Sequence, residues 1–223
     1  MFVPLMYALA RVPRHQRSIT PGQLTAVFRQ AIKNPLVKVT TQRHGFVEKG
    51  QVCVSGNYDP DEDQARGCCV EVNLLYHLDQ QHLVLDQTQW RRLCFDVAEC
   101  VGHEFVHRAQ AKRRKYRAIR EYVSREHCSH KKEEQEYLGT GEEIEAYGFS
   151  IAAELSAMHG TFSIDSPELE NIVMWRVYSS AFDTDQSVVL KLRQQISKYL
   201  CRLEADYHDQ QNSKRPRSRS RRT

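Results

Sequence analysis

The stretch that decides the fold is Leu93–Ala109, which reads LCFDVAECVGHEFVHRA. Apolar residues recur in it at every fourth position, at Leu93, Val97, Val101, Phe105 and Ala109. This spacing winds slowly around a helix and marks its buried side. We therefore expect a long helix here, beginning near Asp86-Gln87-Thr88 and ending in the basic run 112–120.

The same helix carries the sequence His103-Glu104-Phe105-Val106-His107, an H-E-x-x-H pattern. Residues four apart leave a helix on one face, about one turn apart, so both imidazoles can bind one metal ion. Glu104 projects about 80° from their mean direction, where it can reach a water on that ion. Phe105 points away from the histidines and belongs to the apolar row. The alternative without a metal site is a pair of surface histidines on an amphipathic helix.

A hydrolytic zinc site needs a third protein ligand and keeps one position for water. The best segment for that ligand is Gly141–Phe149, GEEIEAYGF, in a second expected helix. Glu143 shares one face of this helix with Tyr147 and Ser150. The residues alone leave other third ligands open: Glu142, Glu145, and the two histidines of the HCSH segment, His127 and His130.

H-E-x-x-H followed by a helix with E-x-E-A-Y resembles the gluzincin group of metallopeptidases. It is most similar to the small single-domain minigluzincins, which include putative phage-encoded peptidases and the ImmA/IrrE group. In these, the first Glu of an E-x-x-A segment is the third ligand. The resemblance implies that role for Glu143, with Ala146 three residues on. It covers roughly residues 68–155, and the 36 residues from His107 to Glu143 are more than compact members have.

The expected chemistry is hydrolysis with one Zn²⁺ per chain held by His103, His107 and Glu143. Glu104 would act as general base towards the metal-bound water. Tyr147 is the candidate for stabilising the developing oxyanion, with Tyr137 and His159 as alternatives. An extended substrate could add to a sheet edge beside the helix, supplied by 68–76 or 82–85.

The order of expected elements is helix, strands, then helices, which is typical of an α+β fold. We expect a zincin-like arrangement, in which a small, mainly antiparallel sheet packs on the active-site helix and a helical part follows. Thr20-Pro21 predicts a helix start. The expected strands are 37–41, 51–56 and 68–76, with an acidic loop at 57–66, and the later helices are 142–159, 167–182 and 186–209.

Residues 1–210 are expected to form a single domain, and 211–223 a disordered basic tail. The tail holds six of the basic residues and no acid, so the formal charge of +4 becomes −2 for the rest of the chain. The basicity therefore belongs to the tail. We expect the tail to contact nucleic acid or another polyanion, with a targeting signal or a solubilising end as alternatives.

Seven scattered cysteines without a C-x-x-C pair indicate a reducing, cytoplasmic setting. The resemblance to phage-encoded peptidases implies that this could be the cytoplasm of a phage-infected host cell. No run approaches the roughly 20 apolar residues of a membrane span, so we expect no membrane partner. The oligomeric state is left open.

The function expected from these patterns is a zinc metallopeptidase, an endopeptidase acting on a protein or peptide. One alternative is a non-catalytic, nucleic-acid-associated or virion structural protein with a zincin fold. Others are a SprT-like protease of DNA-bound proteins, with a histidine as third ligand, and a hydrolase of small amides. An intact Glu104 favours catalysis, because a structural zinc site needs no general base.

Overall fold

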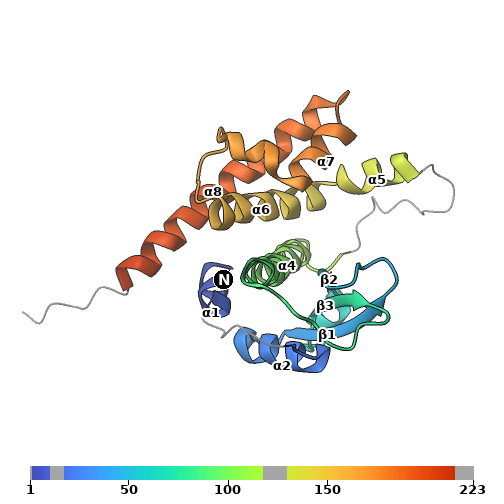
Figure 1. The fold of residues 1–223 in the computed structure, drawn as a ribbon. Coiled ribbons are helices and arrows are strands. Elements are labelled where there is room, and N and C mark those ends of the chain that lie inside the picture. The colour runs from blue at the N-terminus through green and yellow to red at the C-terminus, as the bar shows by residue number, and fades with distance from the viewer. Residues whose placement is uncertain (1, 11–17, 118–129, 214–223) are drawn as a thin grey trace, which may run out of the picture.

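A computed structural model describes residues 2–10, 18–117 and 130–213. It has an α+β architecture in which one long helix, α4 (Gln87–Arg113), lies between two layers. A sheet with its covering helix lies on one side of α4, and a group of helices lies on the other (Figure 1). The helix expected from the apolar row is therefore the central element of the molecule.

The N-terminal layer begins with α1 (Phe2–Ala10) and α2 (Pro21–Ile32). Thr20 caps α2 in a capping box with Gln23, and Pro21 occupies its first turn, as the sequence predicts. The short apolar start of the chain forms α1. Phe2 packs edge-on against Phe95 and Phe149, at ring-centroid distances of 6.3 and 5.5 Å.

The sheet of the described chain has the strand order β1-β3-β2, formed by β1 (Val37–His44), β3 (Val70–His77) and β2 (Val52–Tyr58). β1 runs parallel to β3 and β2 runs antiparallel to it. The expectation of a mainly antiparallel sheet is therefore wrong, because the sheet is mixed. β3 has the most hydrophobic sequence, and its burial explains why it takes the central place between two strands that are neighbours in the chain.

The segment expected to be an acidic loop contains a short helix, α3 (Pro60–Gln64). Asp59 caps it and Pro60 stands at its first position, while carboxylates in its first turn face the positive end of the helix dipole. This helix returns the chain from β2 to β3.

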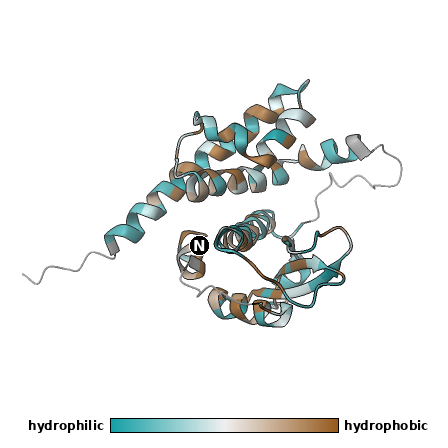
Figure 2. Ribbon diagram, in the orientation of Figure 1, coloured by the Kyte–Doolittle hydropathy of each residue, from teal (hydrophilic) through white to brown (hydrophobic). Residues whose placement is uncertain are grey.

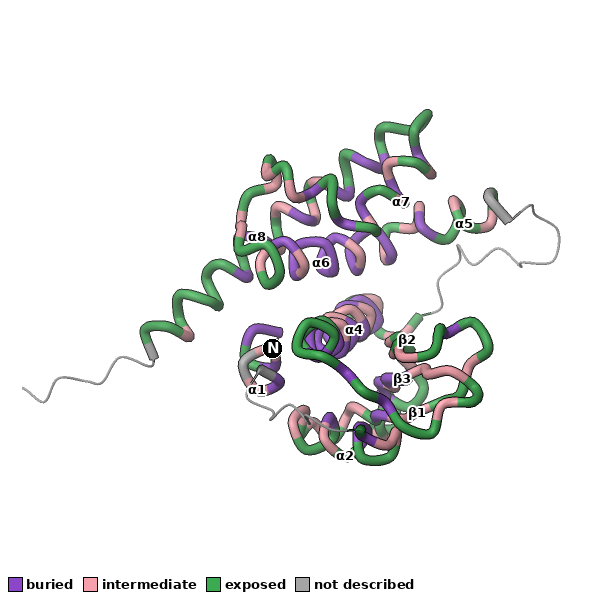
Figure 3. Tube along the Cα trace, viewed as in Figure 1, coloured by how far each residue is buried: buried purple, intermediate pink, exposed green. Residues whose placement is uncertain are grey.

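The C-terminal layer consists of α5 (His130–Leu138), α6 (Gly141–Met158), the 3₁₀ helix η2 (Pro167–Asn171), α7 (Val173–Ala181) and α8 (Gln186–Ser213). The helix expected over 167–182 is divided, because Ile172 has an extended backbone. α6 is buried along most of its length (Figure 3). Hydrophilic residues prevail towards the end of α8 (Figure 2), which reaches three residues into the expected tail. Residues 214–223 of that tail lie outside the described residues.

Two glycines bring the helices of this layer and α4 close together. A Cβ at Gly102 would collide with the Phe149 ring, and one at Gly148 would lie 2.5 Å from Cβ of Gln195 on α8. Small residues thus set the close approach of α4, α6 and α8. Among the described residues, no helix has both the length and the apolar character needed to span a membrane.

Candidate metal centre

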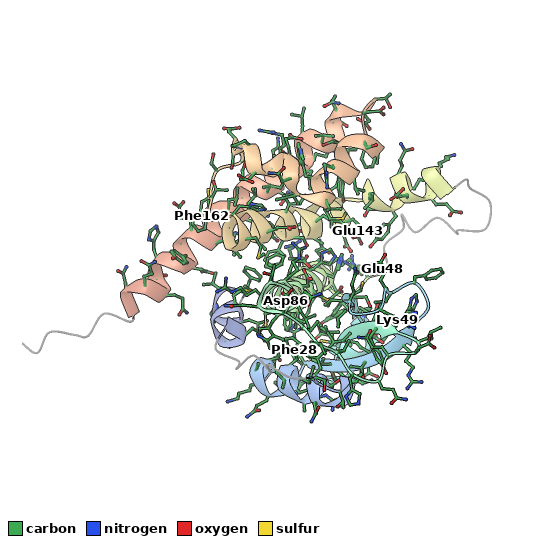
Figure 4. The ribbon with its side chains drawn as sticks, viewed as in Figure 1. Phe28, Glu48, Lys49, Asp86, Glu143 and Phe162 are labelled. Atoms are coloured by element: carbon green, nitrogen blue, oxygen red, sulfur yellow. The ribbon has the colours of Figure 1, made fainter. Side chains whose placement is uncertain are left out.

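The centre lies where α4 faces α6. His103 and His107 leave α4 one turn apart, and Glu143 reaches them from the first turn of α6. Figure 4 shows Glu143 between α6 and α4. The Nε2 atoms of the two histidines are 3.1 Å apart, and His107 Nε2 lies 3.6 Å from Glu143 Oε1. Ligand atoms about 2 Å from a tetrahedral zinc ion lie roughly 3.3 Å from one another. The three side chains thus have the separations of a shared metal site.

Hydrogen bonds orient both imidazoles from behind. Nδ1 of His107 lies 2.8 Å from Oε1 of Gln110, which can only accept, so this nitrogen carries the proton. Nδ1 of His103 lies 3.0 Å from the hydroxyl of Ser150, which itself donates to the carbonyl of Ala146 at 3.3 Å. Both rings therefore turn an unprotonated Nε2 towards the centre.

Two facing nitrogen lone pairs repel each other unless a proton or a metal cation lies between them. Burial and the neighbouring His107 lower the pKa of His103 to about 3, so His103 does not supply that proton at neutral pH. The donor set of two neutral imidazoles and one carboxylate is a ligand set of catalytic zinc.

Glu143 completes this donor set with a carboxylate that the protein leaves partly unsatisfied. The residue is 7% exposed, and its Oε2 has no hydrogen-bond partner among the described residues. Burial raises the pKa of Glu143 by more than the neighbouring His107 and a hydrogen bond from Tyr137 lower it. A buried polar atom without a partner is costly and needs an explanation. A metal ion at the centre provides one.

Glu142 and Glu145, the alternative third ligands on the same helix, face other partners. Glu142 forms an ion pair with Arg114. Glu145 forms ion pairs with Arg113 and Lys198. Among the described side chains, Glu143 alone joins the two histidines in a group able to hold a metal. His127 lies outside the described residues, and only the backbone of His130 is described.

Glu104 lies beside the centre at the interface with β2. It is 8% exposed, and its pKa is raised to about 8 by burial first and then by Glu143 and Glu99. Gly56 of β2 packs directly on it, since a Cβ there would lie 2.5 Å from Glu104 Oε1 and 2.6 Å from Cys100 Sγ. A carboxyl group with this pKa can exchange a proton near neutral pH.

Tyr147 lies on the α6 side of the centre, where its ring meets that of His103 edge-on at 4.9 Å. Burial, followed by Glu143 and Glu99, raises its pKa to about 12, so its hydroxyl keeps its proton and remains a donor. Tyr137 also reaches the centre through its hydrogen bonds to Glu143 and Tyr147. His159 does not reach the centre. It follows the C-terminal end of α6, about 24 Å along the helix axis from Glu143, and it pairs with Glu168.

Sequence reasoning placed Ser150 on the face of Glu143 without assigning it a role, and it missed Gln110 and Gly56. Gln110 stands three positions after His107, and Ser150 seven after Glu143, so helix geometry places both on the ligand faces. That spacing is the sequence signal from which the roles of both residues could have been predicted. Nothing in the sequence marks Gly56, because its contact with Glu104 depends on how β2 docks on α4.

Comparisons of the chain with models of protein families, with curated protein sequences and with solved structures gave no match.

Proposed function

We propose that the chain is a zinc-dependent metallopeptidase of the gluzincin type. The observation that carries the proposal is the pair of Nε2 atoms, 3.1 Å apart and unprotonated, facing a buried Glu143 with an unsatisfied oxygen. His103, His107 and Glu143 would hold one Zn²⁺. The bound ion would supply Lewis acidity and a water of lowered pKa.

The residues around this site have the roles that peptide hydrolysis needs. Glu104 accepts the proton of the attacking water and later delivers it to the leaving amine, for which a pKa near neutrality is suited. Tyr147 or Tyr137 donates a hydrogen bond to the developing oxyanion. Ser150 and Gln110 hold the imidazoles in the tautomer that ligation needs.

The sheet supplies an edge for an extended substrate, although not the expected one. The segment 68–76 forms β3, which is paired on both sides, and 82–85 makes a single bridge between Leu83 and Ile19. β1 and β2 are the edge strands, and β2 is the one that packs on α4, with its exposed Gly56 beside Glu104. We infer that a peptide adds to β2 and passes the general base there.

A cytoplasmic, reducing setting belongs to the same proposal. The six described cysteines are free, including the adjacent pair Cys68 and Cys69. The basic tail is proposed to contact a polyanion through its charge alone. The presence of Glu104 favours catalysis over the alternative of a non-catalytic, nucleic-acid-associated protein with the same fold, because a structural zinc site needs no general base.

The test is the zinc content of the purified chain together with its proteolytic activity. We expect one zinc per wild-type chain, its loss in His107→Ala and Glu143→Gln, and its removal by a chelator. Glu104→Gln should keep zinc and lose activity on an unfolded protein substrate by at least 10²-fold. Zinc retained in Glu143→Gln would assign the third ligand elsewhere. A wild type without zinc after refolding with metal would refute the proposal. A zinc protein that cleaves small amides but no protein would identify a different hydrolase.

A further inference from the structure

A second polar site lies on the side of α4 that faces α3, away from the two histidines. It is an open pocket of about 430 Å³, a size typical of small-molecule sites. Leu36 forms an apolar wall, and the polar lining consists of Asp63, Gln64, Arg66, Arg108, Lys112 and Tyr116. Three basic side chains and one acidic one thus share this pocket.

The acidic side chain is fully used inside the protein. Oδ1 of Asp63 accepts from Arg108 Nε at 2.9 Å, and Oδ2 accepts from the hydroxyls of Tyr58 and Tyr116, at 3.1 and 2.8 Å. Burial raises the pKa of Asp63, but the hydrogen bonds from Tyr116 and Arg108 outweigh it and leave the pKa below its ordinary value. Asp63 and Arg108 therefore neutralise each other at the base of the pocket.

Arg66 and Lys112 remain as uncompensated charges. Both are exposed, and in the described part of the chain neither forms an ion pair. The remaining acids of the α3 region do not line the pocket, and Asp59 is engaged as the helix cap. The pocket therefore carries an excess of two positive charges, although residues 1–210 have a net charge of −2.

Two helix ends bring the pocket residues together. Arg66 follows α3, and Lys115 and Tyr116 follow α4, with φ values of 61°, 54° and 58°. Left-handed residues are common just after the C-terminus of a helix, where the chain turns away. The end of α4 thus places Tyr116 on Asp63, and the end of α3 places Arg66 in the lining of the same pocket.

We propose that this pocket binds the phosphate group of a small ligand. The Arg66 guanidinium can donate two parallel hydrogen bonds to phosphate oxygens, and the Lys112 ammonium adds a third contact with a full charge. Leu36 provides apolar contact for the rest of the ligand. The inference does not depend on the metal centre, because none of its residues is a proposed metal ligand.

The experiment is calorimetric titration of the full chain with inorganic phosphate, at constant ionic strength maintained with chloride. The His107→Ala variant is titrated in parallel to exclude phosphate bound at a metal. We expect saturable binding in both proteins, weakened at least tenfold in Arg66→Ala and Lys112→Ala. Both side chains are exposed, so circular dichroism should show folded variants. Lys191→Ala, which removes an exposed charge on α8, is the matched control and should bind phosphate as the wild type does.

Titrations with two further ligands test which chemical groups the pocket recognises. Butyl phosphate should bind more tightly than inorganic phosphate, because its alkyl chain can contact Leu36, and the dicarboxylate glutarate should bind more weakly than either. Absence of saturable phosphate binding in the wild type would overturn the proposal. Equal binding by the wild type and the Arg66→Ala/Lys112→Ala double variant would also overturn it, since the phosphate would then bind elsewhere, for instance on the basic tail.

Discussion

At the scale of single residues, the candidate metal centre depends on side chains that are not among its three proposed ligands. The hydroxyl of Ser150 and the amide of Gln110 fix which nitrogen of each histidine faces Glu143. Without such a partner an imidazole can rotate or change tautomer, and part of the binding free energy is spent on restoring its orientation.

Ser150→Ala tests this orientation. The hydroxyl is buried and contacts His103 Nδ1, so its removal should lower zinc affinity about 10- to 100-fold, as measured by competition with a chromogenic chelator. Ser156→Ala is the control on the same helix, because its hydroxyl bonds only the carbonyl of Ala153 at 3.1 Å. Equal zinc affinities in Ser150→Ala and the wild type would show that the hydroxyl does not orient the ligand.

Gly56 is the second residue whose size matters. Gly56→Ala would insert a methyl group 2.5 Å from Glu104 Oε1, and the carboxylate would have to move away. We expect unchanged zinc content and a fall in turnover of about 10-fold or more, because the general base is displaced while the ligands are not. Gly22→Ala, where nothing lies within 4 Å, is the control. Loss of zinc in Gly56→Ala would contradict this separation of roles.

At the scale of elements, the register of α6 against α4 decides which glutamate reaches the histidines. The residues on both sides of Glu143 are fixed by the end of α4: Arg114 pairs with Glu142, and Arg113 and Gln110 bind Glu145. Gln110 also donates to the Glu142 carbonyl at 2.8 Å, so one side chain links His107 to the opposite helix.

Glu145→Gln should therefore affect both stability and the metal site. Glu145 is 9% exposed and surrounded by Arg113, Lys198 and Tyr199, so loss of its charge leaves these donors poorly compensated. We expect a decrease in the free energy of unfolding of roughly 1–3 kcal/mol, measured in urea, and a reduced zinc affinity. Glu136→Gln removes an exposed pair with Lys132 and should change stability by less than about 0.5 kcal/mol. Similar effects of the two variants would rule out the proposed role of Glu145.

Elements with local signals could be predicted from the sequence, and those that depend on distant contacts could not. Thr20 and Asp86 cap their helices through residues three positions on, so α2 and α4 begin near the expected positions. The insertion of β3 between β1 and β2 has no local signal, since it depends on burial of β3 against two strands at once.

At the scale of the whole molecule, α4 joins the two layers and contributes to both proposed sites. Its histidines face the helical layer, and Arg108, the residue after His107, faces α3. The H-E-x-x-H spacing located one half of the candidate metal centre, because both histidines lie on one helix. The sequence left Glu142, Glu143, Glu145, His127 and His130 as competing third ligands. Among the three glutamates, packing between the layers decides which one faces the histidines of α4.

Asp63 connects three segments of the N-terminal layer, namely α3, the end of β2 through Tyr58 and the turn after α4 through Tyr116. Its side chain is 3% exposed, and its partner Arg108 is 21% exposed. Replacement by Asn keeps the shape but removes the charge, so Asp63→Asn should be less stable than the wild type by about 3 kcal/mol at pH 7.

The acid limb of the stability curve distinguishes this charge from simple packing. The folded pKa of Asp63 lies below its ordinary value of 3.8, so near and below that pH the unfolded chain binds more protons than the folded one. The stabilisation from Asp63 is thus complete above pH 4–5, roughly, and is lost as the pH falls through the folded pKa. In urea titrations from pH 7 down to about pH 2, the stability difference between wild type and Asp63→Asn should shrink at the acid end. Both proteins should carry His107→Ala, so that metal release in acid does not contribute. A difference that is constant with pH would mean that hydrogen-bond geometry, and not the ionised carboxylate, stabilises this junction.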